Sequence, residues 1–121
     1  MASSHQPGLH DRYTDIRNLR WSPAERTLAR RVFGISLQKE LESVIRETKQ
    51  MAGEIAEPSD LWELESFLTR RRKQIDRKYD FRYSMLIFVF GLLLRERRVS
   101  EKDLNGLSED KLERIRKYAK L

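Results

Sequence analysis

Apolar residues recur every three or four positions over most of the chain, with a few short breaks between the periodic stretches. From about residue 21 to residue 56 this pattern predicts one long helix with two apolar stripes, one before and one after Gly34. The second stripe steps alternately by four and three, which is the heptad pattern of paired helices. Its members are Leu37, Leu41, Val44, Thr48, Met51 and Ile55. Because the two stripes point in nearly opposite directions, the helix either breaks near Gly34 or meets different neighbours with its two halves.

Such a seam on half of a long helix usually pairs with another helix, and a second copy of the chain is a natural candidate. The start of the helix is well marked. Ser22 suits the N-cap, Pro23 the first helical position, and Glu25 completes a capping box.

A second helix is predicted after the break at Gly53 and Pro58, with Ser59 as its N-cap. Its apolar positions share one face: Leu61, Leu64, Leu68, Ile75 and Tyr79. Trp62 lies about 130° round from the centre of that stripe, where an amphipathic helix needs no aromatic residue. Either Trp62 anchors a contact with another chain, because tryptophan is enriched at interface hot spots, or the first helix of its own chain covers it.

The third helix contains the apolar run from Met85 to Leu94, with Asp80 as its predicted cap, and should be the buried centre of the C-terminal half. Ser100 should cap a short helix that ends at Asn105 and Gly106, and Ser108 a last helix with an inner face. That inner face consists of Leu112, Ile115 and Ala119. The fold class is therefore all-α: a stalk of about residues 21–80 and a small head of about 81–121, forming one helical domain in a dimeric assembly. Residues 1–20 read as a disordered tail.

Composition narrows the functional classes. The chain has 121 residues, no cysteine and a net charge of +6. Its longest apolar run is too short to cross a bilayer, so we expect no membrane insertion. With no basic, apolar leader at the N-terminus, a cytoplasmic protein is expected. The positive charge suits nucleic acid, anionic lipid or an acidic protein partner.

Patterns that carry catalytic chemistry are missing. The sequence has no thiol nucleophile, no glycine-rich phosphate loop and no His-Glu-x-x-His motif, and both histidines fall in the tail. The carboxylates mostly neighbour lysine or arginine, as on solvated helix faces. We therefore predict a non-enzymatic protein with no catalytic residue, no metal and no cofactor, which works by binding another protein.

In the densest basic cluster, residues 70–73, Arg71 and Arg72 flank the leucine stripe, one on each edge. Arg72 lies on the Trp62 side of that stripe and can pair with Asp76 four residues on. Within one helix Arg72 and Trp62 are too far apart to touch, at about 15 Å along the axis. Across an antiparallel pair of chains they can stack. The last two predicted helices only superficially resemble half of a helix-turn-helix unit, so nucleic acid binding is disfavoured.

Several ordered segments resemble the fluorescence recovery protein family of cyanobacteria. They are Asp60-Leu-Trp-Glu-Leu-Glu-Ser-Phe-Leu, Arg72-Lys-Gln-Ile-Asp, Lys78-Tyr-Asp-Phe-Arg-Tyr-Ser, Leu86-Ile-Phe-Val-Phe and Gly106-Leu-Ser-Glu-Asp-Lys-Leu-Glu-Arg-Ile. The resemblance covers about residues 21–121. It implies an all-helical homodimer that binds the photoactivated red form of the orange carotenoid protein, mainly through that protein's C-terminal domain. It also implies faster return to the orange form and help in its release from thylakoid-bound phycobilisomes, which ends non-photochemical quenching.

The resemblance also assigns roles to residues. Trp62 and Arg72 match positions at the dimer interface and proposed partner surface, and Leu61 matches an interface leucine. Phe88 and Arg114 match head positions linked to partner contact, although the apolar run alone would place Phe88 in the core.

One position departs from the family. Ser66 stands where the family has an aspartate that could pair with an arginine across the interface, and Glu65 next to it can supply a charge instead. Three hypotheses follow: a regulator of the orange carotenoid protein, a related dimer with a different protein partner, or a basic nucleic-acid-binding module.

Overall fold

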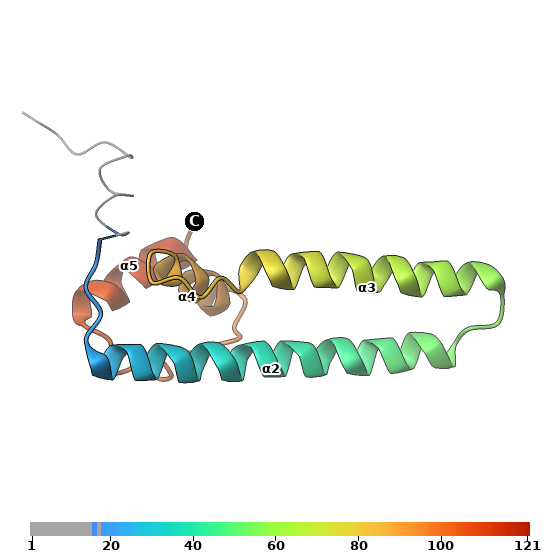
Figure 1. Ribbon diagram of the computed structural model, residues 1–121, viewed down its shortest axis with the longest axis horizontal. Helices are drawn as coiled ribbons and strands as arrows, with labels where there is room; N and C mark the ends of the chain where they lie inside the picture. Colours follow the sequence, from blue (N-terminus) through green and yellow to red (C-terminus); the bar gives the residue numbers. More distant parts are fainter. Residues whose placement is uncertain (1–15, 17) are drawn as a thin grey trace, which may run out of the picture.

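The computed structural model describes residue 16 and residues 18–121, and it folds into a long helical hairpin with a small helical head at its base (Figure 1). The hairpin consists of α2 (Pro23–Gly53) and α3 (Pro58–Lys78), and the head of α4 (Leu86–Arg95) and α5 (Glu109–Ala119). The described residues contain no strand. The predicted all-α fold with a stalk and a head is confirmed for the single chain.

Helix α2 begins as predicted and runs without a break through Gly34. The Ser22 hydroxyl accepts a hydrogen bond from the Glu25 amide at 3.1 Å, and the Glu25 carboxylate accepts one from the Ser22 amide at 3.0 Å. Ala29 and Val32 are buried in the core of the head. The second of the two alternatives is therefore correct: the helix is continuous, and its halves have different neighbours.

The heptad seam finds most of its partner within the same chain. Apart from Leu41, its members are half-buried on a helix that packs against α3. Within one chain α3 is the neighbour of this seam, and a second copy as a further neighbour stays a prediction. The packing of α3 against α2 satisfies the pattern that had suggested an intermolecular coiled coil.

The N-terminus of α3 is built differently from the prediction. Pro58 takes the first helical position, since its fixed backbone angle and missing N–H suit that place. Glu57 is therefore the N-cap residue, and Ser59 is not. The Asp60 carboxylate accepts hydrogen bonds from the amides of Ala56 and Glu57, at 2.9 and 3.0 Å.

Helix α4 forms the centre of the head, as its apolar run predicted. Leu86, Phe90 and Leu93 are fully buried, and α4 packs along α5. Asp80, however, does not cap α4, which starts only at Leu86 after a turn. Its carboxylate instead accepts a hydrogen bond from Arg82 at 2.9 Å.

The segment between α4 and α5 consists of turns, so the short helix predicted after Ser100 is absent. The side chains of Ser100 and Asp103 each accept a hydrogen bond from the other's amide and so close the first turn. Near the end of the segment, Gly106 has a φ of 122°, which favours glycine. Ser108 caps α5 as predicted, and Ile115 on its inner face is fully buried, with Leu112 and Ala119 half-buried beside it. Most of the predicted N-terminal tail lies outside the described residues.

Candidate protein-binding surface

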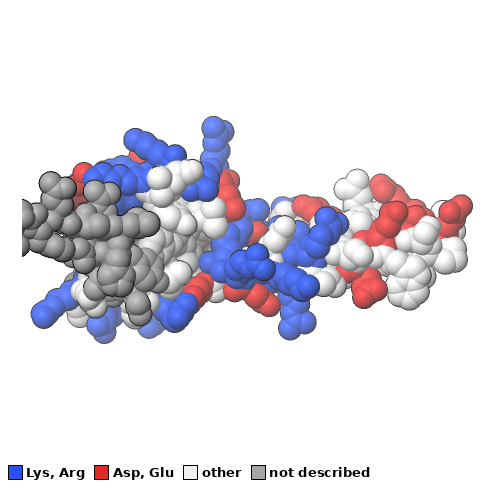
Figure 2. Space-filling view, turned by 90° about the horizontal axis from the view of Figure 1, so that it is seen from above, with Lys and Arg blue, Asp and Glu red and all other residues white. Residues whose placement is uncertain are grey.

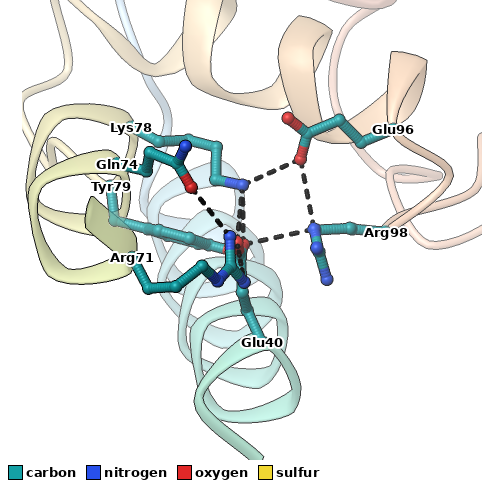
Figure 3. A network of polar contacts seen from close by, with 7 residues as sticks. All are labelled: Glu40, Arg71, Gln74, Lys78, Tyr79, Glu96 and Arg98. Carbon is teal, nitrogen blue, oxygen red and sulfur yellow. Dashed lines mark hydrogen bonds and ion pairs between the residues drawn. The ribbon is translucent and has the colours of Figure 1, made fainter. Parts of the chain in front are cut away.

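A buried carboxylate holds the hairpin at the point where the head begins (Figure 3). Glu40 of α2 has no exposed surface, yet it accepts hydrogen bonds from Lys78 at 2.8 Å and from the Tyr79 hydroxyl at 2.8 Å. Arg71 contacts the same carboxylate at 3.3 Å and Arg98 at 3.2 Å. One carboxylate therefore ties α2 to α3 and to the segment that follows α4.

The way α4 ends places Glu96 and Arg98 in this network. Arg97 adopts a φ of 61°, and the amides of Arg98 and Arg97 bond the carbonyls of Leu93 and Leu94 at 2.8 and 3.1 Å. This is the Schellman ending of a helix, with arginine in the position that usually holds glycine. It turns Glu96 and Arg98 toward the hairpin, where Glu96 bonds Lys78 at 2.8 Å.

The charge balance keeps Glu40 ionised. Burial by itself raises the pKa of Glu40, because a charge is poorly solvated inside a protein. The hydrogen bonds from Lys78 and Tyr79, with the positive charges of Lys78 and Arg98, outweigh that effect and hold the pKa below its ordinary value. Burial and the bond to Glu40 raise the pKa of Tyr79, so the phenol stays protonated and donates.

A second buried pair fixes the N-terminus of α2 to α5. Glu25 accepts hydrogen bonds from the Lys111 ammonium at 3.1 Å and from the Ser108 amide at 2.8 Å. The Lys111 ammonium also bonds the carbonyl of Arg20 at 2.6 Å and lies 5.1 Å from the centre of the Trp21 ring. Arg20, Trp21 and the start of α2 are thereby held to α5, and the hairpin projects from this base.

The projecting hairpin leaves large apolar side chains exposed on one side. Leu41 and Ile45 of α2 are 39% and 51% exposed, and Leu61 and Leu68 of α3 are 48% and 40% exposed. At about 100° per residue, each pair lies on one flank of its helix, and in an antiparallel hairpin these two flanks face the same direction. We call these four residues the apolar strip. Several large apolar side chains exposed on one side of a molecule are typical of a protein contact.

Other residues singled out on α3 are exposed, with Arg72 next to the strip and with Trp62 and Ser66 farther round the helix. Trp62 is 65% exposed, so α2 does not cover it, and the interpretation that its own chain buries it is wrong. Arg72 is exposed and pairs with Asp76 at 3.7 Å, as predicted from their spacing. Glu65 and Ser66 are also exposed, and the Ser66 carbonyl accepts a bond from Arg70 at 3.4 Å.

The two candidate residues of the head are apart from the strip, on α4 and α5. Phe88 is half-buried, with its ring edge-on to Tyr118 at 5.0 Å between centroids. Arg114, one turn before Tyr118, pairs with Asp110 at 3.1 Å. Phe88 is thus neither a fully buried core residue, as the apolar run suggested, nor fully exposed.

Charge is divided along the hairpin (Figure 2). Acidic residues gather at its free end: Glu47, Glu54, Glu57, Asp60, Glu63 and Glu65, with Lys49 as the cation among them. The stretch from Arg70 to Lys78 is mainly basic, with Asp76 as its one acid. The surface therefore has an acidic end, an apolar middle and a basic base.

Two features of this region were not found from the sequence. Carboxylates beside lysine and arginine indicate solvated faces, but Glu40 is buried, and Glu25, which the sequence predicts only as part of a capping box, is buried as well. A signal was available for Glu40, because it lies four residues after buried Ser36 and eight after buried Val32 on the same face.

In the described part of the chain, no group of three or more potential ligand side chains could hold a metal ion. Nor does any described helix have the length and apolar content to cross a membrane.

Comparison with known proteins places the chain. The family described as photoprotection regulator fluorescence recovery protein matches residues 21–119. The fluorescence recovery protein of Synechocystis sp. (strain ATCC 27184 / PCC 6803 / Kazusa) is 40% identical over 101 residues, covering 84% of this chain and 93% of the relative. Two solved structures are similar: those of the fluorescence recovery proteins of Fremyella diplosiphon (34% identity, TM-score 0.82) and of Synechocystis sp. PCC 6803 (39%, TM-score 0.81). Each comparison covers 84% of this chain and 100% of the other. The chain therefore belongs to the fluorescence recovery protein family of photoprotection regulators.

Proposed function

We propose that this protein is a homodimeric regulator that binds the photoactivated orange carotenoid protein through that protein's C-terminal domain, accelerates its return from the red to the orange form and helps to detach it from the phycobilisome. Membership of a family of photoprotection regulators supports the class of function. The observation that carries the proposal is the exposed apolar strip, with Arg72 next to it and Trp62 exposed on the same helix. A lone chain gains nothing by leaving these side chains in water.

The first occupant of the strip is a second copy of the chain, in antiparallel orientation. The strip's midpoint on α3 lies near residue 65, about 12 Å along the axis from the free end of the hairpin and about 12 Å from Lys73 on the other side. A twofold axis at that midpoint brings the acidic end of one chain over the basic stretch of the other. Charge complementarity therefore favours this orientation, because a parallel pair would place like charges together.

The regulatory step needs no bond to be made or broken. A protein that binds the relaxed or transition conformation of its partner more tightly than the red form lowers the barrier between them. The base of the hairpin, fixed by Glu40 and Glu25, presents the hairpin and the head residues Phe88 and Arg114 in a set geometry. Preorganisation of this kind limits the entropy lost on binding.

The test is the dark recovery of purified, photoactivated orange carotenoid protein, followed by absorbance with increasing amounts of this protein. We expect the recovery rate to rise and then saturate. Arg72→Leu should reduce the acceleration roughly tenfold, as expected for an interface hot spot. Arg77→Leu, an exposed arginine on the same helix, is the matched control and should change it little.

An unchanged recovery rate at saturating concentration would refute the proposal. In that case the dimer can still serve a different protein partner. Ser66→Asp, which restores the aspartate of the family, is then the first variant to test. Equal effects of the two arginine variants would mean that Arg72 is ordinary surface.

A further inference from the structure

A second surface lies where α2 passes the turn segment 98–105, close to the head. A groove of about 400 Å³ opens there between the helix and the turns. Buried Val32 and Val99 form part of its lining, and Ile35 is 49% exposed beside them. The groove therefore has a small apolar area, formed by Val32, Ile35 and Val99, within a lining that is otherwise polar and charged.

Positive charge surrounds this lining. Arg31 and Lys39 lie one turn to either side of Ile35 on the same face of α2, and Lys102 lies on the turn segment. None of these three cations forms an ion pair with any described residue. Three cations without an ion-pair partner repel each other around one groove and make it a favourable place for negative charge.

Asp103 in the lining supplies one negative charge and offsets part of this positive charge, but the three cations outnumber it, so the groove keeps a net positive charge. The Asp103 carboxylate accepts a hydrogen bond from the Ser100 amide at 2.9 Å, and it closes the turn. Bonds from Ser100, and to a lesser degree the charges of Lys39 and Lys102, lower the pKa of Asp103. Arg98 also lines the groove, but Glu40 and Glu96 already pair with it.

We propose that this groove binds an acidic peptide segment of a protein partner, with an apolar side chain of that segment seated against Ile35. The proposal rests on the proposed function only in that the partner is a protein. Charge complementarity selects an acidic ligand, and the small apolar area around Ile35 selects one that also carries a hydrocarbon side chain. Nucleic acid fits less well, since no aromatic side chain lines the groove to stack on a base.

The groove remains available in the proposed dimer. Ile35 lies about 120° round α2 from Leu41, and about ten residues nearer the head than Ile45. A second copy seated on the apolar strip therefore leaves this side of the helix open. The two surfaces can act together, one holding the dimer and the other holding a partner segment.

The experiment measures fluorescence anisotropy of a labelled peptide of alternating glutamate and leucine, titrated with the full chain. We expect saturable binding that Arg31→Glu/Lys39→Glu weakens at least about tenfold. The control, Arg46→Glu/Lys49→Glu, makes the same charge change on the same helix outside the groove and should weaken binding less than about threefold. Ile35→Ser should weaken binding of this peptide but not of an all-glutamate peptide.

Equal losses in the two double variants would overturn the proposal, because binding would then follow net charge alone. Equal affinity for the all-glutamate peptide would remove the role of Ile35. Tighter binding of duplex DNA with the same loss in Arg31→Glu/Lys39→Glu would assign the groove to nucleic acid instead. If peptide binding behaves as expected while carotenoid recovery is not accelerated, the groove stands and the proposed function fails.

Discussion

At the scale of single residues, Glu40 decides how the hairpin meets the head. Its carboxylate has no exposed surface and is surrounded by Arg71, Lys78 and Arg98. A buried ion pair is often no more stabilising than a well-packed apolar group, but removing one partner leaves the others uncompensated. The cost of changing Glu40 alone should therefore exceed that of any exposed carboxylate on α2.

The substitution Glu40→Gln keeps the shape of the side chain and removes its charge. We expect the free energy of unfolding to fall by about 3 kcal/mol, because three buried or half-buried cations lose their counter-charge. Urea unfolding followed by circular dichroism measures the change. Glu42→Gln, an exposed residue of the same helix, is the control and should change stability by less than about 0.5 kcal/mol. Similar losses in both variants would contradict the assigned role of Glu40.

The same carboxylate predicts how stability depends on pH. The pKa of Glu40 is lower in the folded chain than its ordinary value of 4.5, and the pKa of Glu25 is lowered too. Such groups stabilise the fold above their unfolded pKa, and this contribution is lost as pH falls through the folded pKa. Stability should be nearly constant from about pH 6 to 7 and fall below about pH 4.5. Urea midpoints across that range test this, and Glu40→Gln should show a shallower fall. An unchanged slope would mean that Glu40 does not titrate as described.

At the scale of elements, two glycines in helices have opposite surroundings. A Cβ at Gly34, midway along α2, would meet no atom within 4 Å, whereas a Cβ at Gly91 would meet the Tyr118 ring at 2.7 Å. Gly34→Ala should therefore raise the free energy of unfolding by about 0.5–1 kcal/mol through lower backbone entropy. Gly91→Ala should lower it, because the packed ring has to move. Thermal unfolding of both variants tests the pair, and a loss of stability in Gly34→Ala would show that α2 needs flexibility there.

The sequence predicted the helices and their caps better than it predicted which parts of the chain pack against them. Local signals were sufficient for the α2 capping box, the α4 core run and the Ser108 cap, because each depends on residues close together in the chain. The cap of α3 was misplaced by two residues, since Pro58 and Asp60 together outweigh Ser59. The spacing of Glu40 after Val32 places it on an inward face of α2, but the partners in its network lie up to 58 positions away, so no local pattern identifies them. The heptad seam was assigned correctly to helix pairing, but its partner could be identified only from the fold.

At the scale of the whole molecule, the apolar strip is the feature that a single chain does not explain. We expect the unmodified protein to have the mass of two chains by size exclusion with light scattering. Leu61→Glu should shift it toward one chain, because a charge in the middle of an apolar contact is costly to bury. Leu121→Glu changes an apolar residue that is 84% exposed at the C-terminus and should leave the dimer intact. A mass of one chain for the unmodified protein at high concentration would contradict the dimer.

The orientation of the two chains follows from charge and can be measured directly. The chain has no cysteine, so Gly53→Cys, whose Cβ has open space around it, accepts a single spin label at the free end of each hairpin. A twofold axis at the middle of the strip places the two ends about 25–30 Å apart, each over the basic stretch of the other chain. A parallel pair would bring the labels within about 15 Å and set the acidic ends against each other. Dipolar distances between the labels therefore separate the two arrangements, and a short distance would exclude the antiparallel pair while leaving the strip as its interface.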